Sequence, residues 1–129
     1  MIVDVHEPAR ILLKAYLNRC GYPNVEESSD SLDALRQIMS ATQDQRPYSM
    51  VFMEWVMPEM DAIEFIQATR QMRSFASFPI IVLAEEYDAE KWQAVMSAGA
   101  NAYLIKPVSE DALLNILLKF EQPARQKSE

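Results

Sequence analysis

The chain contains 129 residues, of which 50% are hydrophobic and 24% are charged, with 12 basic against 19 acidic side chains. This length and composition predict one folded domain with its own core and argue against intrinsic disorder. The net charge of −7 opposes contact with phosphate backbones and anionic lipids, so we expect no binding to nucleic acid or membranes. The first residues lack signal-peptide features and no apolar run could cross a bilayer, which predicts a cytoplasmic protein.

Apolar runs alternate with helical periodicity along the chain. Residues 2–3 form a short apolar run, and apolar side chains spaced three and four apart from 9 to 20 predict a helix that Gly21 ends. A short strand is expected around Val25, and residues 29–31 offer side chains that can cap a second helix. The apolar positions of that second helix are Leu32, Leu35, Ile38 and Met39.

The second half of the chain continues this alternation. The expected elements, in order, are a strand at 48–53 that stops at Glu54, a helix at 62–72, a strand at 79–83, a helix that ends at Gly99, a strand at 102–105 and a helix around 113–120. The folded domain is predicted to span 1–121, and 122–129 read as a polar tail or linker.

Five strands alternating with five helices predict an α/β fold with a doubly wound parallel sheet in the order 2-1-3-4-5. Such a sheet places its site at the carboxyl ends of the strands, where Asp4, Glu54 and Lys106 are expected to meet. A direct pair between Glu54 and Lys106, with Asp4 nearby, would compensate these charges beside apolar strands. From the spacing alone, ordinary strand-end charges in water explain the pattern equally well.

Several short motifs fall at the predicted element boundaries. They are the segment 2–4 followed by Arg10, the segment 57–61 (Met-Pro-Glu-Met-Asp), the segment 98–100 (Ala-Gly-Ala) and the segment 103–107 (Tyr-Leu-Ile-Lys-Pro). Together they resemble the signature of CheY-like receiver domains of bacterial response regulators, over the chain from its first residue to about residue 120. The resemblance implies a flavodoxin-like fold and a part in two-component phosphorelay signalling.

In that family, an acid pair after the first strand and an acceptor aspartate after the third strand hold magnesium. The aspartate takes a phosphoryl group from a histidine kinase. A hydroxyl residue after the fourth strand and a lysine before a proline then bind the phosphoryl oxygens. The hydroxyl residue also couples to an aromatic residue on the fifth strand, which reshapes the face made by the fourth helix, fifth strand and fifth helix.

Carried over residue by residue, this pattern is kept only in part. Asp4 matches the first acid, Tyr103 the aromatic residue, Lys106 the lysine and Pro107 the proline. The resemblance therefore implies a retained acidic pocket and a retained lysine.

The other positions depart from the family pattern. Val5 stands at the second acid, Glu54 at the acceptor, Ala84 at the hydroxyl residue and Ala62 at a usual glycine, while Glu7 could lend a carboxylate only if its loop shifts. Glu54 extends about 1.5 Å beyond an aspartate, by one carbon–carbon bond. Magnesium loses an oxygen ligand at Val5, and a displaced nucleophile slows phosphoryl transfer.

These departures predict a pseudo-receiver that lacks the acceptor aspartate. We expect a non-enzymatic module that acts by protein contacts independently of phosphorylation and without a cofactor. Magnesium binding is expected to be weak or absent, through Asp4 and Glu54 if at all.

Two states remain open: one locked in an active-like form by Glu54, or one uncoupled from phosphorylation. The alternative function is a working phosphorelay receiver helped by Asp61 or Glu7. An unrelated flavodoxin-like enzyme is disfavoured, because both glycines close helices and no phosphate-cradling loop remains.

The expected partner is a protein, such as a histidine kinase or an output domain, bound through the face of the fourth helix, fifth strand and fifth helix; a second copy of the chain, as a homodimer, is another. Trp92, Tyr87 and Val108 are candidate interface anchors, although Trp92 could equally cap the core. Trp55 is expected over the mouth of the site, where it would restrict access by a kinase.

Three further residue types have simpler interpretations. His6 is expected to face solvent, since no second histidine completes a metal site, and Cys20 to be a small buried hydrophobe. Most of the methionines are expected to fill the core, with these on core positions: Met39, Met53, Met72 and Met96.

Overall fold

The structure, a computed structural model, describes residues 1–120. Its five strands are β1 (Ile2–Val3), β2 (Glu27–Ser28), β3 (Val51–Glu54), β4 (Ile80–Ala84) and β5 (Ala102–Ile105). They form one parallel sheet in the order β2-β1-β3-β4-β5, which confirms the predicted doubly wound topology. The predicted tail at 122–129, and residue 121 of the predicted domain, lie outside the described residues.

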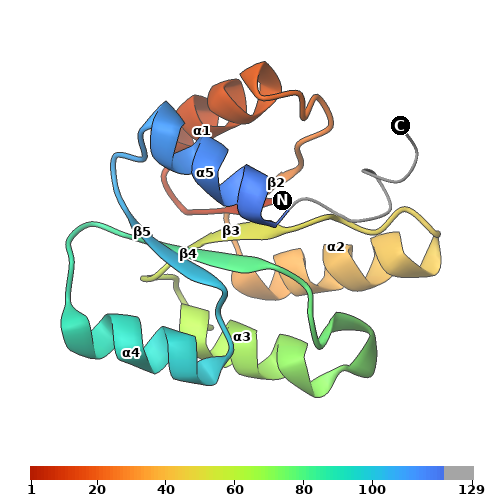
Figure 1. Cartoon of the computed structure of the whole chain (residues 1–129). Helices are drawn as coiled ribbons and strands as arrows, with labels where there is room; N and C mark the ends of the chain where they lie inside the picture. Colours follow the sequence, from red (N-terminus) through yellow and green to blue (C-terminus); the bar gives the residue numbers. More distant parts are fainter. Residues whose placement is uncertain (121–129) are drawn as a thin grey trace.

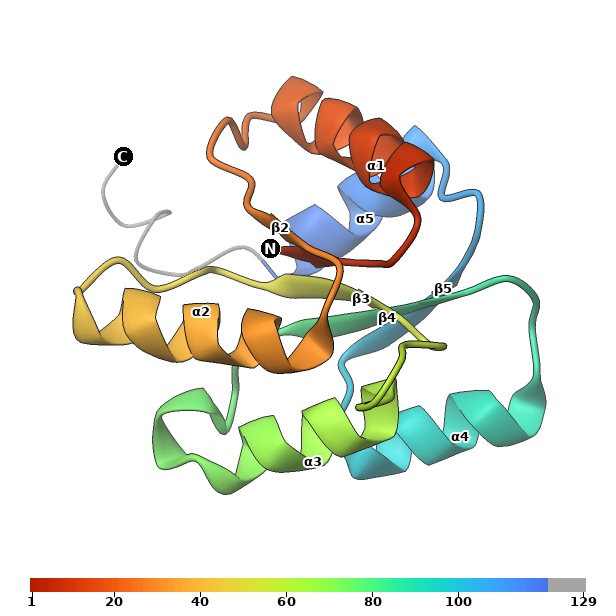
Figure 2. The ribbon, with the colours of Figure 1, turned by 180° about the vertical axis from the view of Figure 1, so that it is seen from behind.

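The helices lie on both faces of the sheet. They are α1 (Glu7–Arg19), α2 (Ser31–Gln43), α3 (Ala62–Gln71), α4 (Ala89–Ala98) and α5 (Glu110–Lys119), with a 3₁₀ turn η1 (Arg73–Phe75) after α3. Helices α1 and α5 cover one face, and α2, α3 and α4 cover the other (Figures 1 and 2). Each strand therefore needs side chains that suit a helix on either side, which explains the uniformly apolar run of β4.

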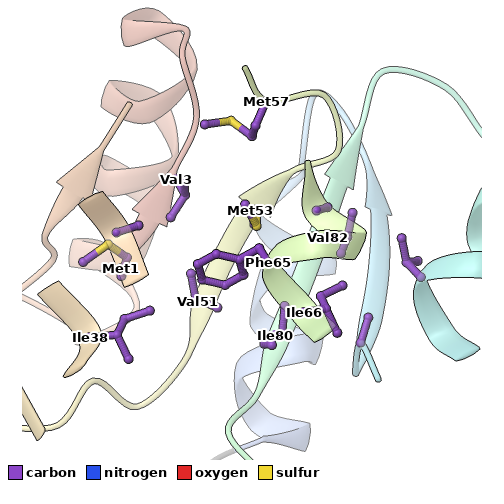
Figure 3. Close-up of a cluster of buried hydrophobic side chains, with 14 of the residues drawn as sticks. Met1, Val3, Ile38, Val51, Met53, Met57, Phe65, Ile66, Ile80 and Val82 are labelled. Atoms are coloured by element: carbon purple, nitrogen blue, oxygen red, sulfur yellow. The ribbon is translucent and has the colours of Figure 1, made fainter. Parts of the chain in front are cut away.

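The core is divided by the sheet into two layers. Val51 and Met53 point from β3 towards Phe65 and Ile66 of α3 in the layer beneath α2, α3 and α4 (Figure 3). On the other face, Phe52 of β3 packs in a cluster with buried leucines of α1 and α5. Alternate residues of one strand thus fill opposite layers, so β1, β3 and β4 each have buried side chains on both faces of the sheet.

Local side-chain chemistry explains where the helices begin. Asp30, Asp61, Asp88 and Ser109 each accept hydrogen bonds from backbone N–H groups of the helix that follows, and Asp61 forms a capping box with Glu64. These caps fix the loops that leave the carboxyl ends of β2, β3, β4 and β5.

The connection from α4 to β5 is held by Arg70 of α3. Its guanidinium donates to the Gly99 carbonyl at 2.8 and 3.0 Å, to Asn101 Oδ1 at 2.9 Å and to the Phe75 carbonyl at 2.7 Å. Gly99 has a φ of 120°, and a Cβ atom there would lie 3.0 Å from Arg70 Cγ. Glycine is therefore required for both the backbone conformation and the close approach.

Several sequence expectations about burial and bounds are wrong in detail. The second strand comes after Val25, at Glu27–Ser28, and Val25 is a buried residue of the loop before it. Met39 is exposed on α2 rather than part of the core, and Cys20 is only half-buried at the end of α1. Leu12 belongs to the apolar spacing that predicted the helix from 9 to 20, yet 44% of it is exposed. Helical spacing indicates a face, but the width of the apolar stripe depends on the neighbours that cover it.

A search of the helices in the described region finds none with the length and apolarity that a bilayer span requires.

Candidate functional site

Three charged side chains meet at the carboxyl edge of the sheet. Asp4 directly follows β1, Glu54 is the last residue of β3, and Lys106 directly follows β5. The two acids are buried, with 1% of Asp4 and 2% of Glu54 exposed. Because parallel strands end at one edge, residues distant in the sequence converge there.

The Lys106 ammonium joins the two carboxylates. Its Nζ lies 2.6 Å from Asp4 Oδ2 and also contacts Glu54 Oε2. The predicted contact between Glu54 and Lys106 is therefore present, and Asp4 shares the same ammonium. We call Asp4, Glu54 and Lys106 the ion cluster. Glu85, which follows β4, stands further out, with Oε1 3.8 Å from Lys106 Nζ.

Asp4 is held from its other side by the loop that leads into α1. The His6 backbone N–H donates to Asp4 Oδ1 at 2.9 Å, and the His6 ring Nδ1 lies 3.2 Å from the same oxygen. Arg10 donates to the Asp4 backbone carbonyl at 2.7 Å and to Glu27 Oε1 at 3.1 Å. His6 faces solvent as expected, but it also contacts the site, which the sequence did not indicate.

Burial and charge act in opposite directions on the ion cluster. Burial raises the pKa of the Glu54 carboxyl, and the Lys106 hydrogen bond and charge oppose that rise without cancelling it. Burial alone would lower the pKa of Lys106, but its hydrogen bonds to Asp4 and Glu54 and their negative charges outweigh it, so the pKa is raised. Lys106 is thus held firmly in its charged form.

The positions that depart from the receiver pattern are arranged around this cluster. Val5 follows Asp4 and is exposed, whereas Ala84 ends β4 and is buried. The Glu7 side chain is exposed on α1, 4.0 Å from Arg10, and Asp61 caps α3. Neither of these two acids joins the ion cluster, and the phosphorelay alternative, in which one of them helps, stays a prediction. Within residues 1–120, no group of three or more histidine, cysteine or acidic side chains is arranged to hold a metal ion.

Tyr103 and Trp55 flank the site on the side of α4. The Tyr103 hydroxyl donates to the Glu86 backbone carbonyl at 3.1 Å, which ties β5 to the loop after β4. The Trp55 ring packs against the core layer beneath α3 and α4, and Lys91 Nζ lies 5.8 Å from its centroid. Trp55 therefore leans towards α4, and its predicted effect on kinase access stays a prediction.

Comparison with known proteins identifies the family. The sequence profile of the response regulator receiver domain matches residues 1–118. This chain belongs to that family. Receiver domains are signalling modules of two-component systems, and they interact with histidine kinases or output domains.

Individual relatives agree with this assignment. The receiver domain is 27% identical to the chemotaxis protein CheY1 of Helicobacter pylori over 113 residues, which cover 88% of each chain. It is 32% identical over 124 residues to the sensor protein EvgS of Escherichia coli; the match covers 96% of this chain and only 10% of that protein's length.

Solved structures share the fold. The chemotaxis protein CheY4 of Vibrio cholerae superposes with a TM-score of 0.81 at 28% identity, covering 92% of this chain and 94% of the other. The receiver domain of the histidine kinase PA1611 of Pseudomonas aeruginosa, which has magnesium in its active-site cleft, has a TM-score of 0.78 at 24% identity, covering 92% and 93%.

The structure separates the predicted interface residues of this receiver domain. Trp92 and Tyr87, on and before α4, are 43% and 65% exposed, so Trp92 does not cap the core. Val108 instead lines a groove beside α1, on the other side of the sheet from α4. The sequence also missed Glu85, although its place directly after β4 was a usable signal that it lies at the carboxyl edge.

Proposed function

We propose that this receiver domain signals through protein contacts without being phosphorylated, and that Lys106 takes the place of the metal. The observation that carries the proposal is the single ammonium shared by Asp4 and Glu54. Two carboxylates against one ammonium leave about one net negative charge, where a further carboxylate would leave a larger surplus for a divalent ion to neutralise. The charges of the ion cluster are thus nearly neutralised by its own side chains.

The residues present fit magnesium poorly, which supports the proposal. Magnesium prefers near-octahedral oxygen ligands, and both buried carboxylates already bind Lys106, while Asp4 Oδ1 also accepts from His6. The next position offers the methyl groups of Val5. A metal would have to displace Lys106 from a buried pair, so we expect magnesium binding to be weak or absent.

The phosphoryl chemistry lacks two further parts. Phosphoryl transfer depends on a positioned nucleophile and on neutralised charge, and the Glu54 carboxylate is engaged by Lys106. The methyl group of Ala84 cannot donate a hydrogen bond to a phosphoryl oxygen. A group attached at Glu54 would find neither the free lysine nor the hydroxyl that normally bind it.

The conformation that we propose for the domain rests on the contact made by Tyr103. Its hydroxyl is bound by the Glu86 carbonyl, so the ring is held against the loop after β4 without any hydroxyl at position 84. We propose that this contact keeps the surface of α4, β5 and α5 in one arrangement that phosphorylation does not change. Exposed apolar residues lie on these three elements, as expected of an interface: Trp92, Ile105, Leu114 and Leu118.

The decisive experiment exposes the domain to magnesium and to acetyl phosphate. Binding is followed by NMR amide shifts, and any acyl phosphate by intact-protein mass spectrometry. We expect no saturation by magnesium in the micromolar range and no added phosphoryl mass. Tight magnesium binding, or a phosphoryl adduct that maps to Glu54, would show instead that the domain works as a phosphorelay receiver.

A further inference from the structure

A groove lies between α1 and the loop that joins β5 to α5. Its volume is about 520 Å³, within the range of small-molecule sites. Leu12 and Leu13 of α1 form one wall, Pro107 and Val108 form the other, and Leu83 of β4 lies between them. Helix α1 and this loop border the same edge of the sheet in both views (Figures 1 and 2).

The groove is apolar along α1 and charged at one end. It reaches from Pro8 to Tyr16, a distance of about 12 Å at 1.5 Å per helical residue. Its charged lining consists of Asp4, Glu85 and Lys106, with His6 beside them, and these lie at the carboxyl edge where α1 begins. An apolar groove with a few polar groups converging at one end is the usual form of a small-ligand site.

The charges at that end select the sign of a ligand. Within the ion cluster and the groove lining, Asp4, Glu54 and Glu85 face one lysine, Lys106, which already contacts Asp4 and Glu54. Arg10, which donates to the Asp4 carbonyl, is paired with Glu27. The Glu85 side chain is 71% exposed, stands 3.8 Å from Lys106 and makes no hydrogen bond within residues 1–120. An anionic head group would be repelled, whereas a protonated amine could pair with Glu85 at the groove mouth.

The size of the groove favours a small molecule over a protein segment. A stable protein interface buries at least about 1,000 Å², which calls for a broad exposed apolar surface. Of the large apolar side chains of α1 that line the groove, Leu12 is exposed and Leu13 is buried, and Leu83 beneath them is buried as well. Two of these three apolar side chains are therefore covered, and the exposed apolar surface that the groove itself offers is small.

We propose that this groove binds an amphiphilic organic cation, with its apolar body along α1 and its protonated amine at Glu85. Glu54, at the phosphoacceptor position, does not line the groove, and the proposal holds whether or not Glu54 accepts a phosphoryl group. Asp4 and Lys106 line both the groove and the ion cluster, so a bound cation would lie beside the buried charges that hold the carboxyl edge together.

Three matched probes test the proposal: phenethylamine, 2-phenylethanol and 3-phenylpropanoate, titrated into the labelled full chain and followed by NMR amide shifts. We expect saturable shifts at Leu12, Leu83 and Val108 with the amine, in the millimolar range. The alcohol should bind about fivefold more weakly, as expected for loss of one partly exposed ion pair. The carboxylate should not bind.

Two variants and one control localise the site. Glu85→Gln should weaken the amine about fivefold and leave the alcohol unchanged, and Ala9→Phe should fill the groove and abolish binding of both. Glu90→Gln, an exposed acid on α4, should change nothing; equal losses in Glu85→Gln and Glu90→Gln would mean unspecific attraction to an acidic surface and would overturn the proposal. Shifts that do not saturate, or equal binding of amine and carboxylate, would also overturn it. So would a basic amphipathic peptide that binds the groove when none of the three probes does.

Discussion

Lys106 and Asp4 are separated by 102 positions in the sequence, yet the ammonium of one lies 2.6 Å from the carboxylate of the other. Both side chains are almost fully removed from water. The contact joins the ends of β1 and β5, two strands that are not neighbours in the sheet. It makes the carboxyl edge one electrostatic unit.

Replacing Lys106 should destabilise the fold strongly. In Lys106→Met, the buried carboxylates of Asp4 and Glu54 lose their shared counter-charge, and breaking a buried pair in this way costs about 3–5 kcal/mol. Urea unfolding at neutral pH measures the loss. Lys91→Met, which removes a lysine stacked on Trp55 at the surface, should cost under about 1 kcal/mol. Similar losses in the two variants would mean that the ion cluster is not a buried unit.

Glu54→Gln should become relatively more stable as the pH rises. The pKa of Glu54 is raised in the folded state by burial, so the folded chain binds more protons than the unfolded chain between the ordinary and the raised value. Stability from this group is present at low pH and is lost as the pH rises through that window. Glutamine does not titrate, so the free energy of unfolding of Glu54→Gln minus that of wild type should increase from about pH 4 towards neutrality. A difference that is flat with pH, measured by urea unfolding, would contradict this.

Restoring the family residues should restore metal binding. The triple variant Val5→Asp, Glu54→Asp, Ala84→Thr supplies a third carboxylate, withdraws the charge at position 54 from Lys106 and returns a hydroxyl. We expect magnesium to bind it at least about tenfold more tightly than wild type, because the added carboxylate supplies the missing oxygen ligand. Calorimetric titration checks this, with Glu7→Asp as a control that adds no carboxylate to the cluster.

The two glycines should respond differently to alanine. Gly21 has a φ of 97° and nothing within 4 Å of an added Cβ, whereas Gly99 has a φ of 120° and faces Arg70 at 3.0 Å. Gly21→Ala should cost about 1–2 kcal/mol from backbone strain alone. Gly99→Ala should cost more, because it also displaces the Arg70 guanidinium from its carbonyl partners. Thermal unfolding gives both values, and an equal cost would show that Arg70 moves aside freely.

The face of α4, β5 and α5 should carry any self-association. Trp92 is 43% exposed on α4, so Trp92→Glu should leave the fold intact and abolish a concentration-dependent dimer in sedimentation. Ile11→Glu, on the exposed side of α1, is the matched control and should leave the dimer unchanged. A dimer that survives Trp92→Glu but not Ile11→Glu would place the interface on α1.

Much of this receiver domain follows from local patterns in its sequence. The alternation of short apolar runs with helical periodicity predicted the parallel sheet and its strand order, because the few ways of covering such a sheet with helices leave little choice. The same topology predicted that Asp4, Glu54 and Lys106 would meet, since parallel strands end at one edge. The departures at Val5, Glu54 and Ala84 could be seen directly in the motifs.

Only the tertiary structure decided how these residues share their contacts. The sequence indicated a pair between Glu54 and Lys106. In the folded domain the Lys106 ammonium also contacts Asp4, because the side chains of three strand ends lie in one small volume. The packing of the helices also makes Leu12 part of a groove wall, and it places Val108 beside α1, away from Trp92. Spacing along a helix or loop specifies a direction relative to the chain, but which neighbour lies in that direction is decided by how the elements pack.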